Sequence, residues 1–228
     1  MRKPFVVGHR GASGLEPENT LRSIGRAIDF GVDAVEVDVR KSKDGKLVIM
    51  HDPSVDRTTN GKGRVASLTL KDLKALDAGK GEKIPTLEEM MGAVRGKVGL
   101  FLEIKEPETT SDMVASVRAA GMESATTFVS FYHPALLRAK LLSPSLRCGA
   151  IFSCEPADLT KLAVDARAEL MLPKIDYVSE RMVKEAHQRS ILVQPWVVNN
   201  PDELEGLTKM GVDGVASDYP NLVIEALR

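Results

Sequence analysis

Short runs rich in β-branched residues alternate with amphipathic segments along almost the whole chain, and this alternation most strongly limits its fold. Eight runs have the character of strands: 5–9, 34–39, 98–104, 126–131, 146–152, 169–174, 191–198 and 213–219. A ninth run, 46–52, lies outside the alternation. Helix start signals stand between the runs, such as Asn19 before an apolar helical pattern and the capping-box spacing of Thr86 and Glu89.

Repeated strand–helix order requires parallel strands joined by right-handed crossovers. Eight such units predict an α/β fold, the closed TIM (β/α)8 barrel, with an open doubly wound sheet as the second choice. The chain has 228 residues, a length at which a single barrel domain occurs, so we expect one domain over residues 1–228. The oligomeric state stays open at this point.

Composition excludes several classes of partner. The formal net charge is -1 and aromatic residues make up 4%, which disfavours both phosphate-backbone binding and base stacking, so no nucleic acid is expected. No apolar run is long enough to span a membrane. Cys148 and Cys154 are the two cysteines, and we expect them to be free thiols in a reducing, cytoplasmic compartment.

The run "AVEVDVR" places Val35, Val37 and Val39 on one face of a strand and two acids, Glu36 and Asp38, on the other. In a barrel the valines pack on the outer helices and the acids face the mouth. Two inward carboxylates repel each other and lose hydration, which predicts a cation between them. Alternating charge toward water on an edge strand is the alternative interpretation.

The stretch "RKSKDGKLVIMHD" that follows has the features of a hairpin, because Asp-Gly favours a two-residue type I′ turn. With that turn, Asp38 and His51 are cross-strand partners on one face, and a slip of one residue turns His51 away. We therefore expect His51 beside the cation site, or paired with Asp38 alone.

Two more strand ends bring further polar residues to the same place, since a barrel keeps its chemistry at the carboxyl ends of its strands. The first run ends with His9 and Arg10, and a guanidinium grips phosphate in bidentate fashion. The third ends "FLEIK", where Glu103 and Lys105 alternate with Ile104. Together these residues predict a hard divalent ion beside a phosphate, with two groups that titrate near neutrality.

Motifs spread from His9 nearly to the end of the chain resemble the glycerophosphodiester phosphodiesterase family, in that family's order and spacing: "HRGASGLEPENT", "EVDVRKSKDGKLVIMHD", "DRTTNGKGRVASLTLKDLKALDAG", "IPTLEEM", "LEIK", "PWVVN" and "VDGVASDYP". The resemblance implies a barrel of the phosphatidylinositol-phospholipase-C-like type. It also implies metal-dependent hydrolysis of small glycerophosphodiesters to sn-glycerol 3-phosphate and an alcohol, with Mg²⁺ or Ca²⁺ as cofactor.

Carried over by residue, the resemblance makes Glu36, Asp38 and Glu103 metal ligands and His9 and His51 the acid–base pair. Arg10 and Lys105 match phosphate-binding positions, and Trp196 matches a residue that lines the glycerol pocket. The segment 52–85 matches a small insertion that caps one side of the mouth.

The sequence leaves several alternatives open. A related barrel can act as a lyase that releases a cyclic phosphate, and a non-catalytic phosphodiester-binding module is a further alternative. The alcohol headgroup, the preferred ion, the roles of the two histidines and the nucleophile are undetermined. We expect His133 and His187 to lie outside the site, while Asp218 is equally consistent with the site and with a neighbouring strand.

Overall fold

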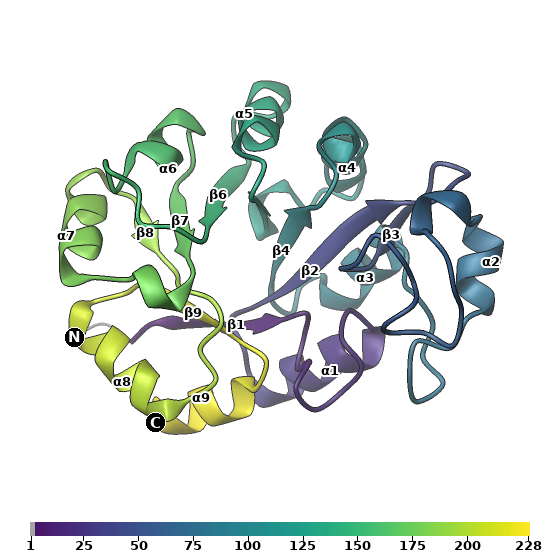
Figure 1. The fold of residues 1–228 in the computed structure, drawn as a ribbon, viewed down its shortest axis with the longest axis horizontal. Helices are drawn as coiled ribbons and strands as arrows, with labels where there is room; N and C mark the ends of the chain where they lie inside the picture. Colours follow the sequence, from purple (N-terminus) through teal and green to yellow (C-terminus); the bar gives the residue numbers. More distant parts are fainter. Residues whose placement is uncertain (1–2) are drawn as a thin grey trace.

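A computed structural model describes residues 3–228. Eight parallel strands form its centre: β1 (Phe5–His9), β2 (Ala34–Lys41), β4 (Gly99–Ile104), β5 (Thr126–Ser130), β6 (Arg147–Phe152), β7 (Leu170–Pro173), β8 (Leu192–Val193) and β9 (Gly214–Ser217). The helices around them are α1 (Leu21–Phe30), α3 (Leu87–Val94), α4 (Thr110–Ala119), α5 (His133–Leu142), α6 (Lys161–Asp165), α7 (Glu180–Gln188), α8 (Pro201–Met210) and α9 (Pro220–Ala226) (Figure 1). Short 3-10 turns at Val65–Ser67, Pro107–Thr109, Glu123–Ala125 and Ile175–Tyr177 join some of them.

The strands follow the order β8-β7-β6-β5-β4-β2-β1-β9, so neighbours in the chain are neighbours in the sheet. The two ends of this order meet through backbone hydrogen bonds, since the Asp213 amide donates to the Val193 carbonyl at 2.9 Å and the Ala216 amide to the Pro195 carbonyl at 3.1 Å. The expected closed barrel is confirmed over the open sheet.

Two apolar clusters lie on the two faces of the strands. Val35, Val37 and Val39 are fully buried in the outer cluster, between the strands and the helices. The inner cluster fills the barrel with residues such as Val7 and Phe101. The alternation along β2 therefore places Glu36 and Asp38 inside the barrel, as the sequence predicts.

Of the two predicted helix caps, one is confirmed and the other lies one residue further along the chain. Thr86 and Glu89 form the full capping box at the start of α3. The cap of α1 is Thr20, whose side chain accepts a hydrogen bond from the Ser23 amide, and the expectation that Asn19 caps this helix is wrong. Asn19 instead binds Asp38, at the mouth of the barrel.

The hairpin register also differs from the prediction. Strand β3 (Leu47–Ile49) pairs with β2 so that Val39 opposes Ile49, one residue away from the register that pairs Asp38 with His51. The cause is a three-residue turn rather than a two-residue one: Ser42 bonds to Lys46, and Gly45 has a φ of 79°. His51 is thus not a cross-strand partner of Asp38. It still reaches the mouth, because β3 ends before it and the chain leaves the ladder.

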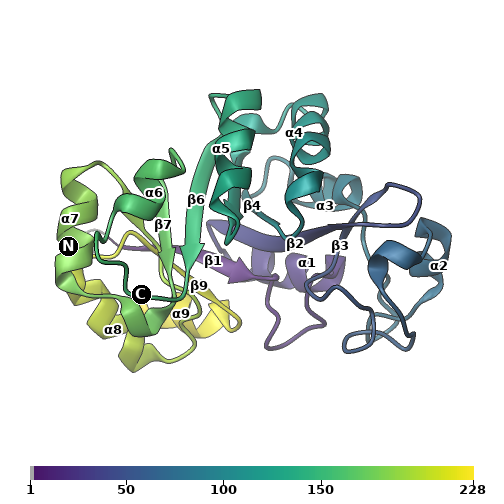
Figure 2. The ribbon, with the colours of Figure 1, turned by 45° about the horizontal axis from the view of Figure 1, so that its top comes forward.

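The residues between β3 and α3 form a separate small layer that includes α2 (Leu70–Ala75). Its apolar cluster contains Met50, Val55, Val65, Leu73, Ala78 and Ile84, together with Val48 of β3. Both views place α2 beside the β2 and β3 side of the barrel, far from α7 and α8 (Figure 1, Figure 2).

Two sequence expectations about the rest of the chain can be compared with the structure. Among residues 3–228, no helix combines the length and the apolar character that crossing a bilayer requires. Cys148 is buried and Cys154 is exposed, and both are free thiols, as expected. The cytoplasmic location stays a prediction.

Candidate active site

Three neighbouring strands, β1, β2 and β4, end at the same side of the barrel mouth. Strand β2 contributes Glu36 and Asp38, and β4 contributes Glu103, which stands opposite Asp38 in the parallel register. All three acids are buried, with exposed fractions of 7%, 1% and 9%. Acidic side chains are almost never buried this far without a partner, so this cluster is the strongest chemical feature of the barrel.

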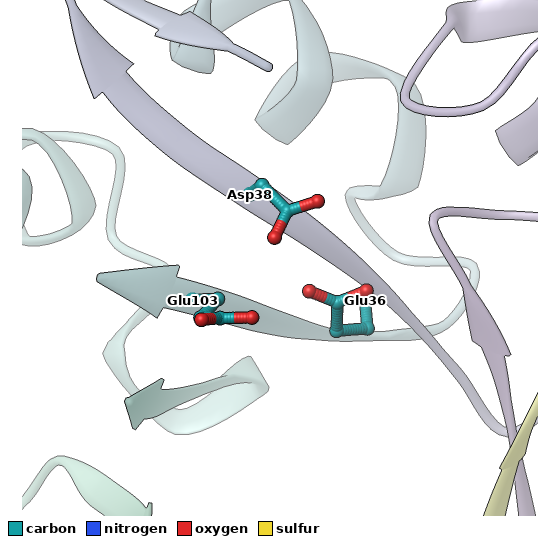
Figure 3. A group of neighbouring side chains, drawn as sticks. All are labelled: Glu36, Asp38 and Glu103. Atoms are coloured by element: carbon teal, nitrogen blue, oxygen red, sulfur yellow. The ribbon is translucent and has the colours of Figure 1, made fainter. Parts of the chain in front are cut away.

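The three carboxylates point toward one another from the two strands (Figure 3). Each offers an oxygen atom that lies within 4.8 Å of those of the other two. Oε1 of Glu36 and Oδ1 of Asp38 are buried and have no hydrogen-bond partner among residues 3–228. Clustered carboxylate oxygens are the donor set that Mg²⁺ and Ca²⁺ prefer, so these residues fit a hard divalent cation.

The surroundings shift the pKa values of the three acids in different directions. Burial, with the negative charges of Asp38 and Glu103, raises the pKa of Glu36 well above its usual value. Burial and the charge of Asp38 raise the pKa of Glu103 to about 7. Burial opposes ionisation of Asp38 as well, but Lys105, Arg10 and His51 outweigh it and lower its pKa to about 2.

Two cationic side chains lie against the carboxylates. Lys105 Nζ is 2.9 Å from Glu103 Oε1 and 3.4 Å from Asp38 Oδ1. Arg10 Nε is 3.3 Å from Asp38 Oδ2. Arg10 has a left-handed backbone, with a φ of 54°, and its amide donates to Glu36 Oε2 at 3.1 Å. Both cations therefore reach the cavity from positions that the acids fix.

The loop after β1 packs closely on α1, which sets the position of His9 and Arg10. Gly11 has a φ of 85°, and a Cβ atom there would come within 2.4 Å of Ser23 Oγ. Glycine is the residue that meets both requirements. The Ser23 hydroxyl donates to the Arg10 carbonyl at 2.8 Å and holds the loop in place.

His9 is oriented by the last strand of the barrel. Its Nδ1 lies 2.7 Å from Asp218 Oδ1, while Nε2 lies 4.0 Å from Glu36 Oε2. Asp218 is itself held by Ser13 and by Asn199, whose Nδ2 donates to Oδ2 at 2.8 Å. Because one ring nitrogen is fixed by the carboxylate, the other faces the carboxylate cluster.

His51 is oriented in the same way by the next residue. Its Nδ1 lies 2.7 Å from Asp52 Oδ1, and Arg57 Nε donates to the other Asp52 oxygen at 2.7 Å. Arg57 also binds both oxygens of Glu18 at 2.8 Å, and Glu18 accepts a bond from Arg10 Nη1 at 2.9 Å. Burial, more than any other influence, lowers the pKa of His51 below its usual value.

A buried guanidinium fixes the backbone at His51. Arg40, at the end of β2, donates from Nε and Nη2 to the His51 carbonyl at 2.8 and 2.7 Å. Its third nitrogen, Nη1, binds Glu106 Oε1 at 3.0 Å. This clamp explains how His51 keeps a defined place after β3 has ended.

A cavity of about 210 Å³ joins these groups, with a charged side and an apolar side. Both histidines, Arg10, Glu36, Glu103 and Lys105 line the charged side. The apolar side includes Trp196, whose Nε1 donates to the Leu172 carbonyl at 3.0 Å and whose ring meets Phe131 edge to face at 5.6 Å between centroids. Every residue that the sequence singled out for the site, except the deeply buried Asp38, thus lines one cavity.

Sequence reasoning did not include several residues that hold the site. Asp52 adjoins His51 in the "HD" pair, which was a signal available in the sequence. Asn19 was assigned to a helix cap, yet its Nδ2 donates to Asp38 Oδ2 at 2.7 Å. Arg40 and Arg57, which bind the His51 carbonyl and Asp52, carried no sequence signal that separates them from surface or core residues. His133 and His187 lie outside the cavity, bonded to the Ile151 carbonyl and to Asp213.

The family model described as the glycerophosphoryl diester phosphodiesterase family matches residues 9–222. The chain belongs to this family. A glycerophosphodiester phosphodiesterase of Caldanaerobacter subterraneus is 34% identical over 99% of this chain and 98% of its own. A glycerophosphodiester phosphodiesterase of Bacillus subtilis is 33% identical over 96% of this chain and 84% of its own.

Solved structures agree with the family assignment. An Oleispira antarctica phosphodiesterase, in complex with the product sn-glycerol-3-phosphate, has a TM-score of 0.90 and 31% identity, and the match covers 98% of this chain and 96% of the other. A putative glycerophosphoryl diester phosphodiesterase of Silicibacter pomeroyi gives a TM-score of 0.90 at 28% identity, over 98% of this chain and 93% of the other. The predictions of the family, of its barrel fold and of an enzyme are confirmed.

Proposed function

We propose that the chain hydrolyses small glycerophosphodiesters to sn-glycerol 3-phosphate and an alcohol, with Mg²⁺ or Ca²⁺ as cofactor. The observation that carries the proposal is the buried cluster of Glu36, Asp38 and Glu103 beside two cationic side chains and two oriented histidines. The product complex of the Oleispira relative, which shares the fold, supports the same substrate class.

Glu36, Asp38 and Glu103 would hold the divalent cation. Two of their buried oxygens lack a hydrogen-bond partner within residues 3–228. Arg10 and Lys105 are the Arg and Lys side chains of the described residues that contact this cluster, so the donor set fits a doubly charged ion. When bound, the cation supplies neutralisation of the phosphodiester charge and polarises a phosphoryl oxygen. Nothing in the donor set separates Mg²⁺ from Ca²⁺.

Arg10 and Lys105 would bind the phosphoryl oxygens. Both line the cavity and both are held by carboxylates, so their side chains lose little freedom when the substrate arrives. Their positive charge opposes the repulsion between the phosphodiester anion and an incoming nucleophile. Trp196, on the apolar side of the cavity, would line the pocket for the glycerol carbons.

His9 and His51 would transfer the protons. Each ring has Nδ1 on an aspartate, which leaves Nε2 free to exchange a proton with the substrate or a water molecule. One unprotonated ring takes a proton from the nucleophile, and one protonated ring donates a proton to the leaving oxygen. The nucleophile is water or the adjacent glycerol hydroxyl, and the latter gives a cyclic phosphate first.

The residues 52–85 would cap one side of the mouth within a single domain that spans residues 1–228. Arg57 supports this role, because it ties the segment to Glu18, which in turn binds Arg10. The small apolar cluster between β3 and α3 gives the segment a core of its own against the barrel. Replacement of Arg57 by Met tests the role: turnover should fall, whereas the matched Arg64→Met change at an exposed position of the same segment should not affect it.

Phosphorus NMR of purified protein with glycerophosphocholine and with bis(glycerol) phosphate tests the whole proposal. We expect sn-glycerol 3-phosphate to accumulate in the presence of Mg²⁺ or Ca²⁺. Its formation should stop when EDTA is added and resume when the ion is restored. A cyclic phosphate as the final product would mean that the protein is a lyase rather than a hydrolase. The panel of substrates also includes glycerophosphodiesters of ethanolamine and inositol and lysophospholipids. If none of them is turned over, the alternative of a non-catalytic phosphodiester-binding module is favoured.

A further inference from the structure

Gln194 is a polar residue that neither the catalytic proposal nor the fold uses. It follows β8, where Val193 is buried in the outer cluster while Leu192 and Trp196 pack on the inner one. This alternation turns Gln194 into the barrel, where its exposed fraction is 1%. The residue lines the same cavity as the two histidines.

The flanking strands offer the Gln194 amide no side-chain partner. Met171 pairs with Val193 in the parallel register, so Leu172 lies beside Gln194 on β7. On the other side, Ala216 of β9 bonds to the Pro195 carbonyl. Leu172 and Ala216 both line the cavity, and neither has a polar side-chain group.

As a consequence, Oε1 of Gln194 is buried and has no hydrogen-bond partner among residues 3–228. An unpaired buried amide destabilises a protein, and an apolar side chain at this position would remove the penalty. The amide is uncharged, so it adds little to phosphate binding. It offers a donor and an acceptor, which is the complement of an alcohol hydroxyl.

The charge and volume of the cavity limit which part of a substrate can bring its hydroxyl to Gln194. Arg10 and Lys105 occupy the charged wall, so a phosphate held there directs its organic part toward the apolar wall that contains Gln194. The volume of about 210 Å³ is below the roughly 300 Å³ at which pockets for drug-sized ligands begin, so the cavity encloses one small moiety. Glycerol phosphate is the part common to every substrate of the proposed reaction.

We propose that Gln194 is a specificity-determining residue that hydrogen-bonds a hydroxyl of the enclosed glycerol moiety. The inference rests on the proposed function and adds to it the residue that recognises the glycerol hydroxyl by a hydrogen bond. A site with a buried amide for this hydroxyl discriminates against a ligand that lacks it, because the amide is then left unpaired.

Ligand binding tests the inference without turnover. Titration calorimetry with Mg²⁺ present compares sn-glycerol 3-phosphate, n-propyl phosphate and inorganic phosphate on the wild type, Gln194→Leu and the matched surface control Gln188→Leu. We expect the wild type and Gln188→Leu to prefer glycerol 3-phosphate over propyl phosphate by about 10-fold or more. In Gln194→Leu this preference should fall by about 5- to 10-fold, with binding of propyl phosphate and inorganic phosphate kept.

The melting temperature of Gln194→Leu should equal or exceed that of the wild type, because an unpaired amide is replaced by an apolar side chain. If this variant does not fold, Gln194→Met takes its place with the same expectations. An undiminished preference in the folded variant would overturn the inference while leaving the function intact. So would a wild type that binds both organic phosphates equally well. A wild type that binds glycerol 3-phosphate no better than inorganic phosphate would instead contradict the proposed function.

Discussion

His9 and Asp218 are separated by 209 positions in the chain, yet Nδ1 of the histidine lies 2.7 Å from Oδ1 of the aspartate. The contact joins the ends of β1 and β9, two neighbouring strands of the closed barrel. His51 and Asp52 repeat the same geometry from adjacent positions. Each proposed proton-transfer group is therefore oriented by its own carboxylate.

Replacement of Asp218 by Asn should lower kcat by about 10-fold or more, a part of the 10²- to 10⁴-fold that positioned proton transfer contributes. The side chain keeps its shape but loses the charge that fixes the His9 tautomer. KM should change little, because Asp218 is not part of the phosphate-binding pair. Steady-state kinetics check this, and a change confined to KM would count against the orienting role.

The stability difference between wild type and Asp218→Asn should depend on pH. Burial opposes ionisation of Asp218, but hydrogen bonds from His9, Asn199 and Ser13 outweigh it and hold its pKa below the usual range. A carboxyl whose pKa is lower in the folded state stabilises the fold above its unfolded pKa of about 4, and loses that contribution as the pH falls further. The difference in urea midpoint between wild type and Asp218→Asn should be larger at pH 5 than at pH 3. A difference that persists unchanged at pH 3 would argue against the shift.

His9→Ala and His51→Ala should each reduce turnover by roughly 10²-fold or more, the scale of lost acid–base catalysis. His187→Ala is the matched control, because His187 is half-exposed on α7, bonded to Asp213 away from the mouth. We expect its kcat to stay at the wild-type level. Near wild-type turnover in His9→Ala or His51→Ala would remove that histidine from the mechanism.

The two cysteines should differ in reactivity. Burial raises the pKa of the Cys148 thiol to about 12, whereas Cys154 is exposed. Iodoacetamide at pH 8 should therefore modify Cys154 alone in the native protein and both residues in urea. Peptide mass spectrometry reads the outcome, and rapid native labelling of Cys148 would mean that the packing of β6 against α5 opens.

Strand β2 shows how far the sequence alone reaches. Its two-residue period placed the valines outward and the acids inward, and the strand order then brought Glu103 opposite Asp38. The position of His51 was harder, because the register depends on whether the turn holds two or three residues, and Asp-Gly is compatible with both. The clamp by Arg40 is a tertiary contact that no local pattern specifies.

Sequence analysis left Asp218 open as a site residue, and the contacts of the site were out of reach for a similar reason. The bond from Asp218 to His9 depends on closure of the barrel, and the ties from Arg57 to Glu18 depend on how the segment between β3 and α3 folds back. Both link residues far apart in the chain. Gln194 resembles any polar residue in a short strand until its neighbours prove to be apolar.

The central claim is that Glu36, Asp38 and Glu103 hold a divalent cation, and diffraction from crystals soaked in Mn²⁺ tests it most directly. The account predicts an anomalous peak about 2.0–2.6 Å from an oxygen of each carboxylate, and its loss or marked weakening in Glu36→Gln. A wild-type map with no peak at this position, and with the three carboxylates turned toward solvent, would contradict it.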